Sequence, residues 1–219
     1  MLQKDEIGEF LKEYHEKGYR IVFSGCVGAV KAMAATISVW KLIDPHRKYI
    51  DAIRTASGSG IPMSLISTST PIETVEEKLP KITLNDLVED IGLFAEHNFS
   101  DKRLANLRNV FAYYVDGYRA AREIVRHLTS YTGIIKGEKI SELLHNTLKS
   151  ELFSNTSPSL EIVATRLDLK RPVIFSNRTT PDVLISRAIT ASCAMRDFMT
   201  PQIIGDIEYE DAAKSEPLP

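Results

Sequence analysis

Hydrophobic positions follow two patterns along the chain: short apolar runs, and spacings of three or four residues. These patterns alternate, which predicts strands separated by helices. Short, mostly apolar runs predict strands at 19–23, 49–56, 160–165 and 172–175. Apolar side chains that return every three or four residues predict helices at 2–17, 29–42, from 58 onward, 83–94, 103–129, 138–152 and 181–194. Strands interleaved with helices indicate an α/β protein whose central sheet is mainly parallel.

Helix-breaking residues set the expected boundaries. The stretch 67–80 contains three threonines and two prolines, which predicts a loop. Thr180 before Pro181 predicts a helix start, because threonine caps a helix and proline fits its first position. The tail from Glu210 is expected to be irregular.

The longest predicted helix carries a heptad-like stripe from Leu104 to Leu128. This stripe is the place to expect a protein partner or a second copy of the chain. Packing of the helix against its own domain explains the same stripe more simply, because the repeat is short and rich in tyrosine.

Composition narrows the class of protein. The 219 residues fit one domain, 1–219, with a helical insert or cap at about 70–155. A net charge of −2 argues against nucleic-acid binding, which needs a basic face. The two cysteines follow no metal-ligand spacing. No signal peptide or membrane-spanning run is visible, so a cytoplasmic location is expected.

Candidate chemistry begins at Ser57, which follows the predicted strand 49–56 and stands among small residues. A serine on a sharp strand-to-helix turn is typical of a nucleophile in acyl transfer. The alternative is that the Ser57 hydroxyl only caps the next helix.

Two other segments have the chemistry that such a serine needs. The turn Gly25-Cys26-Val27-Gly28 follows the first predicted strand, and Asp211 lies in an acidic segment near the end of the chain. Each also has a simpler interpretation, namely an ordinary strand-to-helix turn and an exposed acidic residue.

Taken in order, these segments resemble the patatin-like phospholipase family. That family carries a glycine-rich loop, a Gly-x-Ser-x-Gly nucleophile turn and an Asp-Gly-Gly or Asp-Gly-Ala motif. The resemblance covers most of 19–217 and is strengthened by the strand pair 160–175 and by 191–201, which is similar to the family's Ala-Ser-x-Ala segment. Several family glycines are replaced here, by Cys26, Val27, Thr55, Ser59, Ala212 and Ala213, and Arg196 replaces a proline.

The resemblance implies a three-layer α/β/α fold and a lipid acyl hydrolase, a phospholipase A or esterase. It implies Ser57 as nucleophile, Asp211 as its base, and no metal or cofactor. The implied oxyanion hole is formed by Gly25, Cys26, Val27 and Gly28. The substrate would be a phospholipid or another fatty acyl ester, met through peripheral contact with a membrane.

The replaced glycines support a second interpretation, in which the chain keeps the fold as a catalytically inactive binding or assembly module. An acyltransferase is a third, because the same acyl-enzyme can pass its acyl group to an alcohol instead of water.

Overall fold

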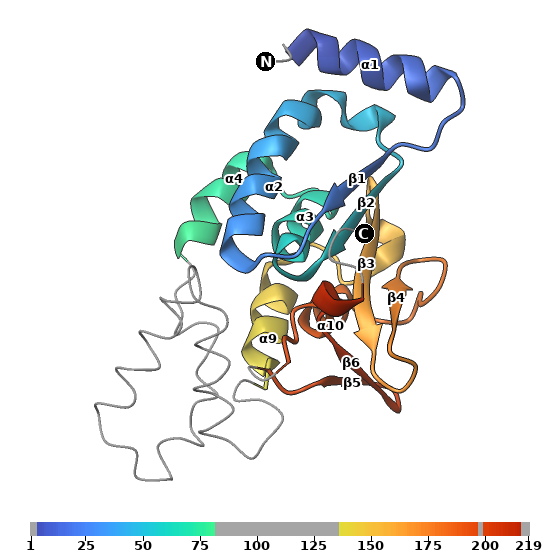
Figure 1. Cartoon of the computed structure of the whole chain (residues 1–219). Coiled ribbons are helices and arrows are strands. Elements are labelled where there is room, and N and C mark those ends of the chain that lie inside the picture. Colours follow the sequence, from blue (N-terminus) through green and yellow to red (C-terminus); the bar gives the residue numbers. More distant parts are fainter. Residues whose placement is uncertain (1–3, 82–135, 197–198, 216–219) are drawn as a thin grey trace.

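The computed structural model describes residues 4–81, 136–196 and 199–215, which form a mixed sheet flanked by helices (Figure 1). The six strands of this sheet are β1 Val22–Gly25, β2 Ala52–Ala56, β3 Ser159–Arg166, β4 Arg171–Phe175, β5 Gln202–Ile204 and β6 Ile207–Glu210. The α-helices of the described residues are α1 Lys4–Glu16, α2 Ala29–Ile43, α3 Gly60–Ser67, α4 Ile72–Lys78, α9 Glu138–Thr147 and α10 Ile185–Ser192. Short 3-10 helices are η1 Asp44–Tyr49, η2 Ser57–Ser59, η3 Leu79–Lys81, η5 Phe153–Asn155 and η6 Ala212–Lys214.

The strand directions confirm the predicted α/β class with its mainly parallel sheet. Strands β1, β2 and β3 are adjacent and parallel. Strands β4 and β6 both run antiparallel to β3, and β5 is antiparallel to β6. Strand β5 therefore points the same way as the first three. Strand β3 is the centre of the sheet, and residues 160–165 within it are all buried.

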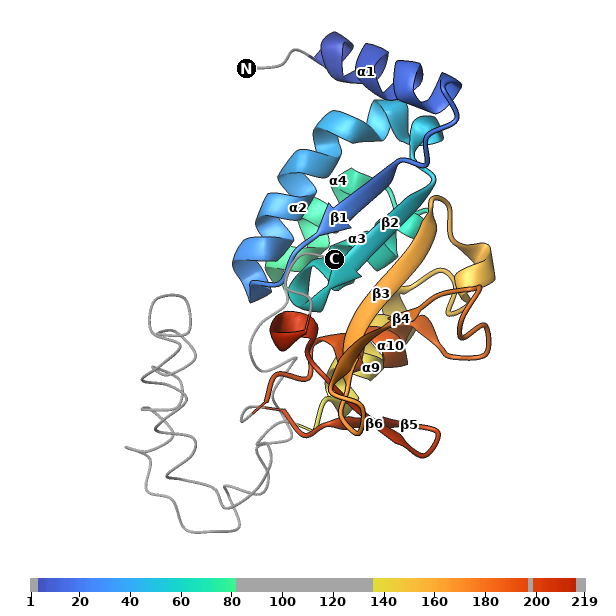
Figure 2. The ribbon, with the colours of Figure 1, turned by 45° about the vertical axis from the view of Figure 1, so that its right-hand side comes forward.

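One face of the sheet and the helices beside it form the main core. Side chains alternate between the two faces of a strand, so Ile53, Leu160 and Ile162 share this face. Helices α3 and α10 pack against β3, and α9 packs on α10 (Figure 2). The largest fully buried side chains include Trp40, where α2 joins the same core.

Helix α1 lies at one end of the molecule, against η1 and α2 (Figure 1). Its apolar stripe anchors it through the buried Leu11, and Gly8 lies directly against the His46 ring. Phe10 and Tyr14 of the same helix are exposed, with ring centroids 4.5 Å apart.

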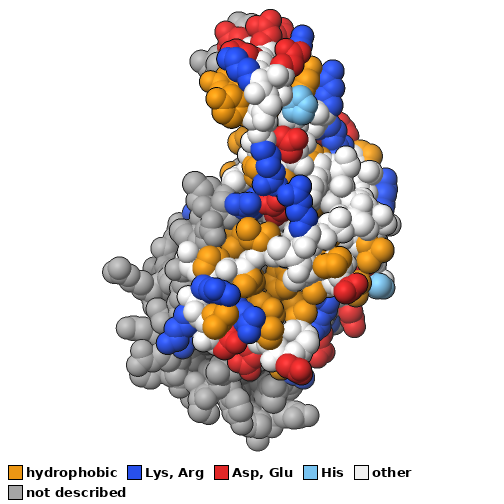
Figure 3. Space-filling view, turned by 90° about the vertical axis from the view of Figure 1, so that its right-hand side faces the viewer, with side chains coloured by type: hydrophobic (Ala, Val, Ile, Leu, Met, Phe, Trp, Pro, Cys, Tyr) orange, Lys and Arg blue, Asp and Glu red, His pale blue; other side chains and the backbone are white. Residues whose placement is uncertain are grey.

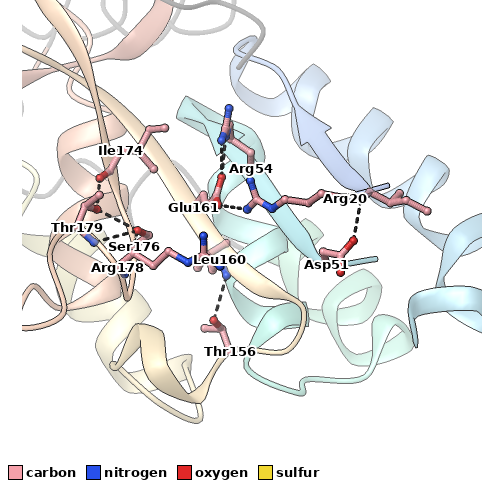
Figure 4. A network of polar contacts seen from close by, with 11 residues as sticks. Arg20, Asp51, Arg54, Thr156, Leu160, Glu161, Ile174, Ser176, Arg178 and Thr179 are labelled. Carbon is pink, nitrogen blue, oxygen red and sulfur yellow. Dashed lines mark hydrogen bonds and ion pairs between the residues drawn. The ribbon is translucent and has the colours of Figure 1, made fainter. Parts of the chain in front are cut away.

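The opposite face of the sheet carries a charged cluster of Arg20, Arg54 and Glu161 (Figure 4). Pairing of β2 with β3 sets Arg54 beside Glu161, and the Arg54 Nε donates to Glu161 Oε2 at 2.7 Å. Arg20 donates to the other carboxylate oxygen. Burial raises the pKa of the Glu161 carboxyl, but hydrogen bonds from Arg20 and Arg54 outweigh it, so the pKa lies below its usual value.

Several predicted boundaries need correction. The predicted loop 67–80 contains α4, because Pro71 caps a helix whose Ile72 and Val75 are buried in the core. The predicted helix 138–152 ends at Thr147. The first strand was predicted three residues too early, since β1 begins at Val22.

The helix predicted at 181–194 is shorter at both ends. The Thr180 hydroxyl accepts the Ser176 N–H instead of capping the helix, so the chain turns there. Helix α10 begins at Ile185, where the Glu151 carboxylate accepts the Ser186 N–H.

The hairpin of β5 and β6 was not predicted at all. The predicted helices 83–94 and 103–129, with the stripe 104–128 and most of the insert 70–155, lie outside the described residues.

Candidate active site

The ends of two strands meet beside β3, and the candidate residues follow those ends. Strand β2 pairs with β3 as far as Ala56 opposite Val163. Strand β6 approaches from the other direction and pairs as far as Glu210 opposite Thr165. Strand β4 occupies the other side of β3 at these positions, so β2 and β6 share one side. The next residues of the two strands, Ser57 and Asp211, are thereby brought together from 154 positions apart in sequence.

Ser57 lies on a sharp strand-to-helix turn, as predicted. Strand β2 passes through η2 into α3 without an intervening loop. Ser57 has a φ of 56°, in the left-handed region that a side chain with a Cβ seldom adopts. Backbone strain of this kind collects at functional sites. The alternative role as a helix cap is wrong, because η2 is capped at Ala56 and α3 at Ser59.

Asp211 is held from several directions and is only 5% exposed. Its Oδ1 accepts the Ala213 N–H at 2.7 Å, and its own N–H donates to the Ala194 carbonyl at 2.9 Å. The Thr165 hydroxyl donates to the Asp211 carbonyl at 3.0 Å. The interpretation of Asp211 as an exposed turn residue is therefore wrong.

The electrostatics of Asp211 link it to Ser57. Burial raises the pKa of the Asp211 carboxyl. Hydrogen bonds from the Ser57 side chain and the Ala213 amide lower this pKa by less than burial raises it, so it ends above its usual value. Ser57 is 7% exposed. A hydroxyl thus lies beside a carboxylate in a nearly dry setting, which is the arrangement that lets a weak base accept a proton.

The loop Gly25–Gly28 packs against the same turn. A Cβ on Gly25 would lie 2.8 Å from both Cβ and Oγ of Ser59, so only glycine fits there. Gly28 has a φ of 143° and stands at the N-terminus of α2, which contacts η2. Cys26 and Val27 between them are half-buried. The loop therefore places backbone N–H groups and the positive end of a helix near Ser57.

The residues that replace the family glycines adopt backbone conformations that any residue can adopt. Thr55 lies in regular β2, and Ser59 has a helical φ of −64°. Val27 and Ala212 are not among the residues with positive φ, and Asp211 has a φ of −51°. None of these positions needs the conformational freedom of glycine.

Sequence reasoning missed the role of the C-terminal end of α10 and the residues just after it. The Ser57 N–H donates to the Ser192 hydroxyl at 2.7 Å, and the charge of Asp211 adds to burial in raising the pKa of the Cys193 thiol. The segment 191–201 was noted only as similar to a family motif, and no pattern in the sequence indicates that it touches both candidate residues.

A separate open hollow lies at the β5–β6 hairpin, lined among others by Leu167, Ile203 and Glu208. Neither Ser57 nor Asp211 lines it. Among the described residues, no helix combines the length and the apolar character needed to cross a membrane.

The comparison with known protein families matches a range that contains all six strands of the sheet. The family described as patatin-like phospholipase matches residues 21–219. A search of curated proteins finds no match. Among solved structures, VipD from Legionella pneumophila is 15% identical with a TM-score of 0.49, over 87% of this chain and 45% of that one.

Two structures of a second protein, ExoU, also match. The type III effector protein ExoU is 17% identical with a TM-score of 0.39, over 82% of this chain and 39% of that one. ExoU in complex with SpcU, from the type III secretion system of Pseudomonas aeruginosa, is 17% identical with a TM-score of 0.37, over 82% of this chain and 38% of that one. The chain spans less than half the length of each of these solved proteins.

Proposed function

The chain belongs to the patatin-like phospholipase family, and from this premise we propose that it is a lipid acyl hydrolase with Ser57 as nucleophile and Asp211 as base. The observation that carries the proposal is the meeting of these two buried side chains at the opposed ends of β2 and β6. No histidine is required in this arrangement.

The proposed reaction has two halves. In the first, Ser57 Oγ attacks the ester carbonyl carbon while its proton passes to the Asp211 carboxylate, and the tetrahedral intermediate then expels the alcohol, which takes that proton. In the second, water attacks the acyl-serine, gives a proton to Asp211, and releases the fatty acid as the serine is protonated again. The raised pKa of Asp211 favours both transfers, because it brings the carboxylate closer in basicity to an alcohol.

The oxyanion would be received by the loop after β1. The N–H of Ser57 already donates to Ser192 and is not available. Backbone N–H groups of Gly25, Cys26, Val27 and Gly28 are the proposed donors, supported by the N-terminus of α2. Loss of one such donor typically lowers the rate by about a hundred- to a thousand-fold.

The proposed substrate is a phospholipid or another fatty acyl ester, met at a membrane surface. Transfer of the acyl group to an alcohol instead of water would use the same residues. The near enclosure of Ser57, which is 7% exposed, favours a second candidate function, a binding module without turnover.

Reaction with a fluorophosphonate probe and hydrolysis of p-nitrophenyl esters in mixed micelles test the proposal. Ser57→Ala should abolish labelling, and Asp211→Asn should reduce it severely. Ser64→Ala is the control, because that buried hydroxyl only donates to the Ile61 carbonyl within α3. Labelling that survives Ser57→Ala overturns the assignment. A folded wild-type protein that neither labels nor hydrolyses supports the binding module.

A further inference from the structure

The hydroxyl of Ser192 joins the nucleophile turn to the centre of the sheet. It accepts the N–H of Ser57 at 2.7 Å and donates to the carbonyl of Val163 on β3. Ser192 is fully buried, so water cannot replace either bond. The bridge lies where β2 ends, one residue beyond the pairing of Ala56 with Val163.

The residues just after Ser192, at the end of α10, also hold the other candidate residue. Two positions after Ser192, the carbonyl of Ala194 accepts the N–H of Asp211 at 2.9 Å. Cys193 lies between them, close enough to Asp211 for its charge to affect the thiol pKa. The end of α10 thus touches the backbone of both Ser57 and Asp211, which arrive from opposite directions along β3.

We propose that Ser192 is a positioning residue that fixes the backbone of Ser57 in its left-handed conformation and so aims the Ser57 hydroxyl at Asp211; its catalytic consequence rests on the function proposed above. A φ of 56° is unfavourable for serine unless neighbouring contacts enforce it. The Ser192 bridge supplies such a contact at the strained residue itself. Without the hydroxyl, the buried Ser57 N–H would lose this partner, and the turn would relax to recover one.

A structural role alone predicts something different. If Ser192 merely filled the core, Ser192→Ala would lower stability and leave the turnover of the folded enzyme unchanged. If it positions Ser57, the folded variant should lose kcat while KM stays nearly constant, since misplacement of a reacting group costs rate more than binding.

The experiment compares Ser192→Ala with Ser67→Ala. Ser67 is also fully buried, but its hydroxyl donates only to the Ser64 carbonyl in its own helix, α3. Hydrogen exchange of the Ser57 amide, followed by NMR, should be strongly protected in wild type and in Ser67→Ala, and should accelerate at least about tenfold in Ser192→Ala. In Ser192→Ala, kcat and the fluorophosphonate labelling rate should fall by roughly 10- to 100-fold.

Ser192→Cys covers the case in which the alanine variant does not fold, because a thiol of similar size makes weak forms of both hydrogen bonds. It should give intermediate exchange and intermediate kcat. A Ser57 amide that stays protected in Ser192→Ala, or a kcat equal to that of Ser67→Ala, overturns the proposal. If wild type has no turnover, the proposed hydrolase fails, while the amide exchange still decides whether Ser192 fixes the turn.

Discussion

Asp211, directly after β6, and Glu161, within β3, are buried carboxylates whose pKa values shift in opposite directions. Their exposures are nearly equal, at 5% and 7%. Burial raises the pKa of both carboxyls, yet the pKa of Asp211 ends above its usual value and that of Glu161 below it. The difference lies in the partners, which are a hydroxyl and an amide for Asp211 and two guanidinium groups for Glu161.

The difference in partners suits Asp211 to the proposed role of proton acceptor and suits Glu161 to a structural role. Glu161 lies between Arg20 and Arg54 and keeps its charge, so its contribution is to tie β2 and β3 to the segment before β1 (Figure 4). Asp211 has no cation among its named partners, so burial keeps the pKa of its carboxyl above the usual value. On the face of the molecule seen in Figure 3, Lys and Arg side chains lie beside apolar ones, where charge stays accessible to water.

The largest contrast is expected from Asp211→Asn against Glu161→Gln. Asp211→Asn should lower esterase activity by at least about 1000-fold, because an amide cannot accept the serine proton. The Asn oxygen can still accept the Ala213 N–H, so the fold should be retained. Glu161→Gln should leave activity within a few fold. Equal losses in the two variants, measured as kcat/KM, would remove the distinction between them.

The next contrast concerns two glycines with positive φ. Gly28→Ala and Gly205→Ala each force a side chain into an unfavourable backbone region, at φ +143° and +63°, which should cost about 1–2 kcal/mol in unfolding free energy. Only Gly28 belongs to the proposed oxyanion loop, so its change should also lower kcat by roughly 100-fold. Urea denaturation and steady-state kinetics measure the two effects separately. Similar kinetics in both variants would argue against the loop.

A smaller effect is expected on stability at the charged cluster. Glu161→Gln removes the charge shared by two partly exposed arginines, whose side chains keep 45% and 26% of their accessible surface. The guanidinium groups can rehydrate, so we expect a loss of about 1–2 kcal/mol rather than the larger cost of a fully buried broken pair. The same urea experiment on Asp211→Asn should show no loss, or a slight gain, at neutral pH. A stabilised Glu161→Gln would contradict the assignment of Glu161 as structural.

The smallest expected effect is on the pH dependence of unfolding. The stability that Glu161 contributes is present at neutral pH and is lost as pH falls below about 4, since its pKa is lower in the folded protein. The contribution of Asp211 has the opposite sign: it is present at low pH and is lost as pH rises through its raised pKa. Urea midpoints between pH 3 and 7, with each neutral variant subtracted, should give slopes of opposite sign. Slopes of the same sign would refute the contrast.

The sequence predicted those elements whose pattern is contained in one continuous stretch of the chain. The runs 160–165 and 172–175 are long and apolar enough to predict β3 and β4, and alanine-rich 29–42 predicts α2 almost to the residue. Strands β5 and β6 escaped detection because they have only 3 and 4 residues and, unlike the segment at β1, do not lie in a longer apolar run.

Ser57 stood out through its own turn, but its pairing with Asp211 was predictable only through the family resemblance. Nothing local to Asp211 distinguishes it from Glu208 or Glu210, and its burial follows from the pairing of β6 with β3, a contact between distant segments. The role of Ser192 depends on three segments at once, so it became visible only in the folded chain. The predicted partner surface at 104–128 lies outside the described residues, so it stays a prediction.

The contact between Gly25 and Ser59 has a consequence for how this protein can evolve. A methyl group at position 25 and the side chain at position 59 would compete for one small volume, since they would be 2.8 Å apart. The loop 25–28 and the turn that carries the proposed nucleophile therefore cannot change independently. A library that randomises position 25 alone should return only glycine, whereas one that also allows Ser59→Gly should recover alanine at position 25.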